Sequence, residues 1–271
     1  MGGEMTGLRC VVSSGAAFCA LILSADARSD ELGLAEQAQN PIADLISLPF
    51  QNNTNFNVGT LGNDQNILNI QPVIPFELNE NWNLITRSIL PVTYQPALFE
   101  GDDADFGLGD FNPSFFFATT AGSGVTWGVG PSFLLPTATD KRLGTDKWSA
   151  GPTGVIVVTQ GKWVYGALAS NLWSFAGDSK RQDINQFLLQ YFVNYNLANG
   201  WYLVSAPIIT ADWTRDSGDQ WTLPFGGGVG RVFNIGAQPV NMSLQAYDNV
   251  TAPTGGADWQ LRFQAQLLFP K

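Results

Sequence analysis

The stretch that decides the fold runs from Trp259 to Phe269 and reads WQLRFQAQLLF. Successive side chains of a β-strand point to opposite faces, so this alternation places Gln260, Arg262 and Gln264 together on one face. The opposite face is apolar along its whole length. About 9–11 tilted residues of strand cross a bilayer. The stretch therefore predicts a transmembrane strand with lipid on its apolar side and a polar lumen on the other.

The same pattern recurs along the chain. Tight polar links such as Asn199-Gly200 alternate strictly with longer polar segments such as 137–147. About twelve segments of strand length lie between them, near 46–58, 67–78, 82–95, 110–121, 125–136, 148–159, 163–174, 184–197, 201–213, 221–233, 239–248 and 258–269. Short turns at one end and longer loops at the other are typical of outer-membrane barrels. We expect an all-β fold, a transmembrane antiparallel up-and-down β-barrel over residues 46–271.

The faces of the segments differ in how clearly they can be assigned. Residues 125–136 and 184–197 alternate well, and their polar face carries Gln, Asn, Ser and Gly rather than Lys and Glu. A water-soluble barrel would show the inverse, with apolar side chains inside and charged ones outside. The segments near 148–159, 163–174 and 201–213 alternate less cleanly, so their faces stay unassigned.

The nine tryptophans all lie near strand ends. One set follows the short turns, namely Trp82, Trp127, Trp163 and Trp201. The other set flanks the long loops, namely Trp148, Trp173, Trp213, Trp221 and Trp259. Amphipathic rings gather at the two water–lipid boundaries, whereas tryptophans that nucleate hairpins in a soluble protein would also occur in mid-strand. Their placement predicts an aromatic girdle at each boundary.

Composition excludes several classes of function. The chain has 271 residues, 13% of them charged, and no histidine. Histidine bases, histidine-activated nucleophiles and histidine metal ligands are therefore absent. The longest apolar run beyond residue 27, Val155 to Val158, is about four residues, far short of the roughly 20 that a membrane helix needs. We expect no enzyme activity, no cofactor and no metal centre. A net charge of −10 also argues against a nucleic-acid partner.

Residues 1–27 resemble a cleaved secretory signal peptide. Arg9 supplies a positive charge, Cys10–Leu23 is apolar, and Ala25-Asp26-Ala27 has the small-x-small cleavage pattern. Both cysteines, Cys10 and Cys19, lie in this segment, so the mature chain would contain no disulfide. A secreted, acidic chain without cysteine indicates the bacterial envelope. With the strand pattern, this predicts the bacterial outer membrane, with its lipid and lipopolysaccharide as contacts.

Residues 28–45 are expected to form a periplasmic segment before the first strand. Ser29 can cap a short helix over Asp30 to Ala38, and Pro41 can end it. The segment either plugs the lumen or touches its rim, or it hangs free.

Two arginines indicate which side chains line the lumen. Arg87 shares a face with Ile85 and Ile89, and an arginine facing lipid at mid-depth would cost about 2–4 kcal/mol. We therefore expect it to face the lumen, as Arg262 does by alternation, either paired with an inward carboxylate such as Glu77 or within a polar constriction. The lumen candidates are Asn69, Gln71, Glu77, Arg87, Gln186, Gln190, Asn194, Gln245, Gln260, Arg262 and Gln264.

Two further segments leave alternatives open. Segment 96–109 is acidic and contains no basic residue. Its carboxylates could hold Ca²⁺, although EF-hand spacing is absent, or meet the cations that bridge lipopolysaccharide. Folded inward, this loop would favour cations or neutral solutes. The glycine-rich segment 225–230 lacks the following helix that a phosphate loop needs, so its glycines are expected to relieve crowding or to permit curvature.

Several stretches resemble one bacterial family. They are NILNIQPVIPF (66–76), WNLITR (82–87), GLGDFNPSFF (107–116), WGVGP (127–131), LPTAT (135–139), KWSAGP (147–152), WSFAG (173–177) and LFPK (268–271). The chain resembles the outer-membrane proteins labelled as phenol meta-cleavage pathway proteins or transporters, also mislabelled neuromedin U. The resemblance implies a barrel with a channel role and no catalytic residues. Barrels usually end in an aromatic residue read by the barrel assembly machinery, whereas here Pro270 and Lys271 follow Phe269.

Three functions remain open at this point. The first is a passive channel for small neutral or hydrophobic solutes, with aromatic ones suggested by the family label. Twelve strands enclose a lumen narrower than that of wide aqueous porins. The second is a closed structural barrel, or one that binds partners through its loops, without transport. The third is an enzyme housed in a barrel, which the lack of histidine disfavours.

Overall fold

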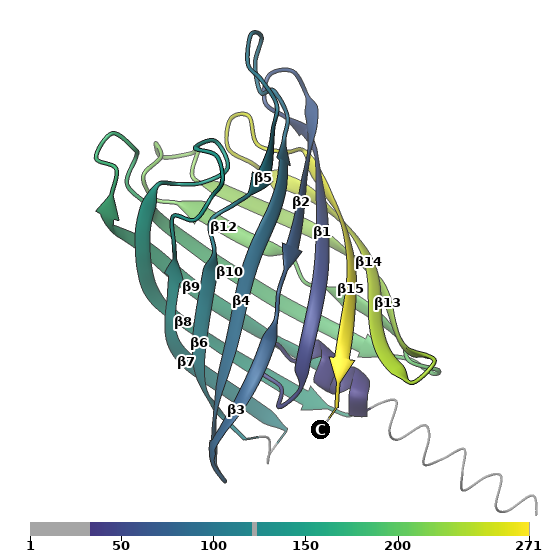
Figure 1. Ribbon diagram of the computed structural model, residues 1–271. Coiled ribbons are helices and arrows are strands. Elements are labelled where there is room, and N and C mark those ends of the chain that lie inside the picture. The colour runs from purple at the N-terminus through teal and green to yellow at the C-terminus, as the bar shows by residue number, and fades with distance from the viewer. Residues whose placement is uncertain (1–32, 121–123, 271) are drawn as a thin grey trace, which may run out of the picture.

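The chain forms one closed antiparallel sheet in the computed structural model, which describes residues 33–120 and 124–270 (Figure 1). The expected signal peptide, residues 1–27, lies outside the described residues. The strands are β1 (Ile46–Val58), β2 (Asn63–Ile70), β3 (Val73–Asn79), β4 (Trp82–Gln95), β5 (Asp105–Leu108), β6 (Asn112–Thr119), β7 (Val125–Leu134), β8 (Lys147–Gln160), β9 (Trp163–Gly177), β10 (Asn185–Asn196), β11 (Trp201–Ser205), β12 (Ile208–Asp212), β13 (Trp221–Ile235), β14 (Gln238–Thr251) and β15 (Trp259–Phe269).

The prediction of twelve spanning strands is confirmed. The fifteen described strands make up twelve spans, because three of the spans are each divided into two strands. β2 and β3 both pair with β4, and β5 and β6 pair with its other edge. β11 and β12 likewise share β10 as a neighbour. Pro72 and Pro207 lie at two of these interruptions. Proline has no backbone N–H to give to a ladder, so a strand that contains it breaks or bends there.

The sheet closes because its first and last strands pair. β1 and β15 run antiparallel from the pair Ile46–Phe269 to the pair Phe56–Trp259. β9 and β10 also pair antiparallel, and this pairing connects the two ends of the remaining strand order. A closed sheet has no free edge, so each spanning strand has backbone partners on both sides, although the short β5 pairs with β4 alone among the named strands. This is the arrangement that allows strands to cross hydrocarbon, where unpaired backbone groups are costly.

The alternation of side chains agrees with the sequence-based prediction. In β15, Phe263 is 46% exposed on the outside, whereas Arg262 beside it is 3% exposed. In β7, Trp127 and Val129 are exposed and Ser132 is buried. Figure 1 shows tilted strands with the longer loops at the upper end and short turns at the lower end. The outer face is therefore apolar, and the polar face is turned into the barrel.

The glycine-rich segment lies within β13, so it is part of the wall and forms no phosphate loop. A Cβ placed on Gly230 would collide with the ring of Tyr202. Tyr202 points inward from β11, is 3% exposed, and donates a hydrogen bond to Asn241 Oδ1 at 2.6 Å. Glycine at this position leaves room for a large inward ring and so relieves crowding, as the sequence suggested.

A short helix spans residues 33–39, close to the expected 30–38. Figure 1 shows it at the lower end, beside the C-terminus. The chain from this helix to β1 packs against inward-facing wall residues, including Tyr202, Val204 and Leu268. In residues 33–120 and 124–270, no helix is long and apolar enough to span a membrane.

Candidate functional site

Among the described residues, three cavities follow one another along the lumen of the barrel. A cavity of about 510 Å³ lies toward the long loops, between residues such as Asn55, Gln65 and Thr222. It shares Gln51 and Asn69 with a middle cavity of about 80 Å³. The middle cavity shares further residues with a third, of about 140 Å³, which borders the N-terminal segment. The smallest space thus lies at mid-lumen, and we call it the waist.

The predicted lumen residues lie on these cavities, with Glu77 as the exception. The residues that line them are Asn69, Gln71, Arg87, Gln186, Gln190, Asn194, Gln245, Gln260, Arg262 and Gln264. Glu77 lies near the short-turn end of β3, opposite Asn83, and is exposed. It forms none of the described ion pairs, so the proposed pairing of Glu77 with Arg87 is wrong.

Arg262 is held on several sides by the wall. It donates hydrogen bonds to Asn53 Oδ1 at 3.1 Å, to Ala206 O at 2.8 Å and to Gln260 Oε1 at 3.1 Å. Its guanidinium also lies 4.9 Å from the centre of the Tyr247 ring. Ala206 O belongs to the interruption between β11 and β12. Arg262 therefore links β15 and β1 to this break in the wall.

Arg87 is bound less completely. Among the described residues, it donates a hydrogen bond to Gln71 Oε1 at 2.9 Å. Arg87 lies in β4 opposite Val73 on one side and Ser114 on the other. It lines both the waist and the cavity next to the N-terminal segment, and it is partly exposed to this internal space. Its guanidinium is thus a positive charge presented to the lumen.

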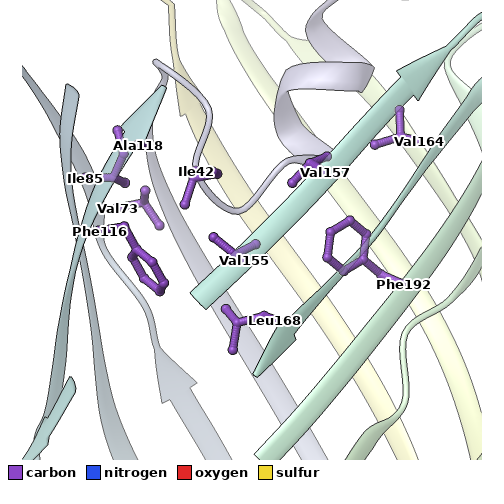
Figure 2. Packing of buried hydrophobic residues seen from close by; sticks show 10 residues of the cluster. All are labelled: Ile42, Val73, Ile85, Phe116, Ala118, Val155, Val157, Val164, Leu168 and Phe192. Atoms are coloured by element: carbon purple, nitrogen blue, oxygen red, sulfur yellow. The ribbon is translucent and has the colours of Figure 1, made fainter. Parts of the chain in front are cut away.

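One wall of the lumen is apolar, which sequence reasoning missed. Phe116, Val155, Val157, Leu168 and Phe192 are buried inward-facing residues of one cluster (Figure 2). β8 and β9 supply part of it, and these were two of the segments whose faces could not be assigned. Their run of apolar residues on both faces, as in 155–158, was the available signal. The lumen is therefore amphipathic, because these hydrocarbon side chains line it together with amides and serines.

The N-terminal segment joins this apolar wall. Ile42, on the loop after the helix, packs with Val73, Ile85 and Val157 in the same cluster (Figure 2). Ala35 in the helix is 2% exposed and packs with the residues around Tyr202. The segment thus inserts apolar side chains among inward-facing wall residues at the short-turn end.

The segment is also tied to the wall by polar contacts. Gln39 Nε2 donates to Asn196 Oδ1 at 2.8 Å, and Asn196 Nδ2 donates back to Gln39 Oε1 at 3.3 Å. Asn196 is a buried residue at the end of β10. These paired amides join the helix end to the barrel rim.

The acidic loop has basic partners from a neighbouring loop. Arg142 makes ion pairs with Asp102 at 2.8 Å and with Asp105 at 3.1 Å. The backbone N–H of Leu98 and the guanidinium of Arg142 hold the pKa of Asp102 below its ordinary value. Among the described residues, no cluster of three or more metal-ligating side chains could hold a metal ion. The acidic residues cross-link loops at the long-loop end and do not line the cavities.

The tryptophans form aromatic contacts at both ends of the barrel. At the short-turn end, Trp82 and Trp127 meet edge to face with ring centres 5.5 Å apart. At the long-loop end, Trp213 and Trp221 do the same at 5.2 Å. Trp148, Trp163, Trp173 and Trp201 are exposed on the outer surface.

Comparison with known proteins rests on structure. No protein-family model matches the chain, and no curated protein matches it in sequence. The chain is similar to the COG4313 outer membrane channel from Pseudomonas putida F1, with a TM-score of 0.64, 15% identity, and coverage of 83% of this chain and 94% of that one. The chain has the fold of a bacterial outer-membrane β-barrel. With its apolar outer face, this fold belongs in the outer membrane.

Two further solved structures are less similar to this chain. Outer membrane phospholipase A from Escherichia coli gives a TM-score of 0.43 at 12% identity, with 90% of this chain and 98% of that one covered. A Pseudomonas aeruginosa FadL homologue gives 0.42 at 12% identity, with 84% and 91% covered.

Proposed function

We propose that the protein is a passive outer-membrane channel for small neutral or hydrophobic solutes. The observation that supports this most is the series of three lumenal cavities linked by shared side chains. The amphipathic lining suits solutes with an apolar body, because Phe116, Leu168 and Leu188 line the waist together with amides and serines. The resemblance to proteins of aromatic degradation points in the same direction and remains a hypothesis about the solute.

The N-terminal segment is part of this proposal as a periplasmic plug. It borders the cavity of about 140 Å³ with residues from Gln37 to Pro41. A solute that has passed the waist reaches this segment next, so passage into the periplasm requires the segment to shift. The aromatic girdles and contacts with lipopolysaccharide and the assembly machinery belong to the same proposal of an outer-membrane barrel.

Solute flux tests the proposal directly. The refolded protein is placed in planar bilayers for single-channel recording and in liposomes for swelling with glycerol and arabinose. We expect small, discrete conductance steps and swelling that is faster with glycerol than with the larger sugar. A barrel that gives neither conductance nor swelling, with the N-terminal segment present or removed, would instead be the closed structural or loop-binding barrel.

A further inference from the structure

The waist of the lumen carries a positive charge without a described counter-charge. The described ion pairs all lie at the long-loop end, in the loops or at the strand ends next to them, where Arg142, Lys147, Arg181 and Arg215 bind aspartates. No Asp or Glu among the described residues lines any of the three cavities. Although the chain as a whole is acidic, the described lining of these three cavities is therefore positive.

The two lumenal arginines differ in how many of their N–H donors are used by the wall. Arg262 is 3% exposed and uses three nitrogens in hydrogen bonds to wall oxygens. Arg87 bonds to one neutral amide oxygen, Gln71 Oε1. A guanidinium has five N–H donors in a planar fork that matches both oxygens of a carboxylate. A charge deep in a protein is costly without an opposite charge, so an anion in the lumen would be stabilised beside Arg87.

The other residues that line the waist indicate what kind of group the anion would carry besides its negative charge. Phe116, Leu168 and Leu188 line the same cavity of about 80 Å³ as Arg87. Burial of hydrocarbon against such side chains is favourable because it removes apolar surface from water. Hydroxyl groups of Ser114 and Ser132 lie 2.8 Å from each other in the same lining and add neutral donors. A bare inorganic anion would leave the apolar side unused.

We propose that Arg87 binds the carboxylate of small hydrophobic carboxylic acids at the waist, with the apolar body of the solute against Phe116, Leu168 and Leu188. This inference rests on the proposed channel function and narrows its solute class. It also revises the expectation that an acidic loop folded inward would favour cations or neutral solutes, because Asp102 and Asp105 pair with Arg142 and no acidic residue of the loop lines the three cavities.

Binding is measured first, because it does not depend on flux. The full chain in detergent is dialysed against radiolabelled benzoate at pH 7, with unlabelled benzoate and its neutral isostere benzamide as competitors. We expect saturable benzoate binding, against which benzamide competes at least tenfold less well. Arg87→Gln should remove this preference, and Arg87→Lys should retain part of it because the charge remains. Equal competition by the two compounds, or unchanged binding in Arg87→Gln, would overturn the proposal.

A matched control removes a different arginine of the same barrel. Arg231 is on the outer face of β13, 5.4 Å from the ring centre of Trp201, and lines none of the cavities. Arg231→Gln makes the same change in net charge and should leave benzoate binding as it is. Loss of binding in this variant would show that the preference comes from overall charge and would contradict a site at Arg87.

Measurements of ionic current test the carboxylate site and the channel function separately. In bilayers, added benzoate should reduce the chloride current of the wild-type protein more than benzamide does, and Arg87→Gln should abolish the difference. Conductance without any such difference refutes the carboxylate site and leaves the channel standing. Binding of benzoate that depends on Arg87, in a protein that conducts nothing, refutes the channel and supports the site.

Discussion

Asp110 shows how one side chain holds the long-loop end together. This carboxylate, 7% exposed, accepts hydrogen bonds from Ala138 N at 3.1 Å and from Thr145 N and Oγ1 at 2.7 Å. Asparagine has a single carbonyl oxygen, so Asp110→Asn turns an N–H₂ group toward one set of donors. A buried donor that loses its acceptor costs about 1–3 kcal/mol. We expect a loss of that size in urea-induced unfolding of the protein in lipid vesicles.

The control for Asp110 is an exposed aspartate of the same end. Asp103 is exposed, and its side chain makes none of the described hydrogen bonds with residues of loop 137–147. Asp103→Asn should leave the unfolding midpoint unchanged. Equal midpoints for both variants would show that Asp110 does not stabilise the barrel through this loop.

The placement of Arg87 could be predicted from the sequence, whereas its hydrogen-bond partner could not. The inward placement of Arg87 follows from the cost of a charge in lipid, which needs no knowledge of neighbours. Its partner could not be predicted, because that depends on the register between strands. The register sets Arg87 opposite Val73 and Glu77 opposite Asn83, and the hydrogen bond to Gln71 follows from the break at Pro72.

Among the elements, the N-terminal segment controls the proposed lower exit. Removing residues 33–43 takes away Ala35 and Ile42, which pack inside the wall, and the amide pair of Gln39 with Asn196. The barrel itself is closed by the pairing of β1 with β15, so it should still fold. We expect the single-channel conductance to rise several-fold, as measured in planar bilayers under identical salt.

A variant with the segment in place provides the comparison. Gly33 lies in the same helix, lines none of the three cavities, and a Cβ added to it would meet no atom within 4 Å, so Gly33→Ala changes the helix without removing an inserted side chain. Its conductance should match that of the wild-type protein. If the deletion variant conducted no more than Gly33→Ala, the segment would not be the barrier to flow.

The strands themselves were largely predictable, and the apolar wall was not. Alternation identifies a face only where the two faces differ, as in β15. β8 has Ile156 at 49% exposure between the buried residues Val155 and Val157, so lipid and lumen both meet hydrocarbon there. The apolar inward face of β8 packs against Ile42, which comes from a segment that is distant in sequence, so the pattern of β8 alone could not predict it.

On the scale of the whole molecule, charge is distributed in a way that composition conceals. The net charge of −10 comes with ion pairs gathered at the long-loop end, where Lys147 and Asp183, for example, lie 3.0 Å apart. The Lys147 ammonium holds the pKa of Asp183 below its ordinary value. The hydrocarbon-facing band carries little charge, which explains the small charged fraction, and the lumen carries two arginines. An overall acidic protein can therefore present a positive interior to a solute.

The girdles predict the depth at which tryptophan meets lipid. Trp127 and Trp163 mark the short-turn end, and Trp173 and Trp259 mark the long-loop end. Because these rings lie near strand ends, lipids brominated high on the acyl chain should quench the intrinsic fluorescence more strongly than lipids brominated near the bilayer centre. The measurement uses the protein refolded into vesicles of each lipid, with detergent-solubilised protein as the unquenched reference. Strongest quenching from the bilayer centre would contradict boundary positions for the tryptophans, and with them the placement of the barrel by its two aromatic ends.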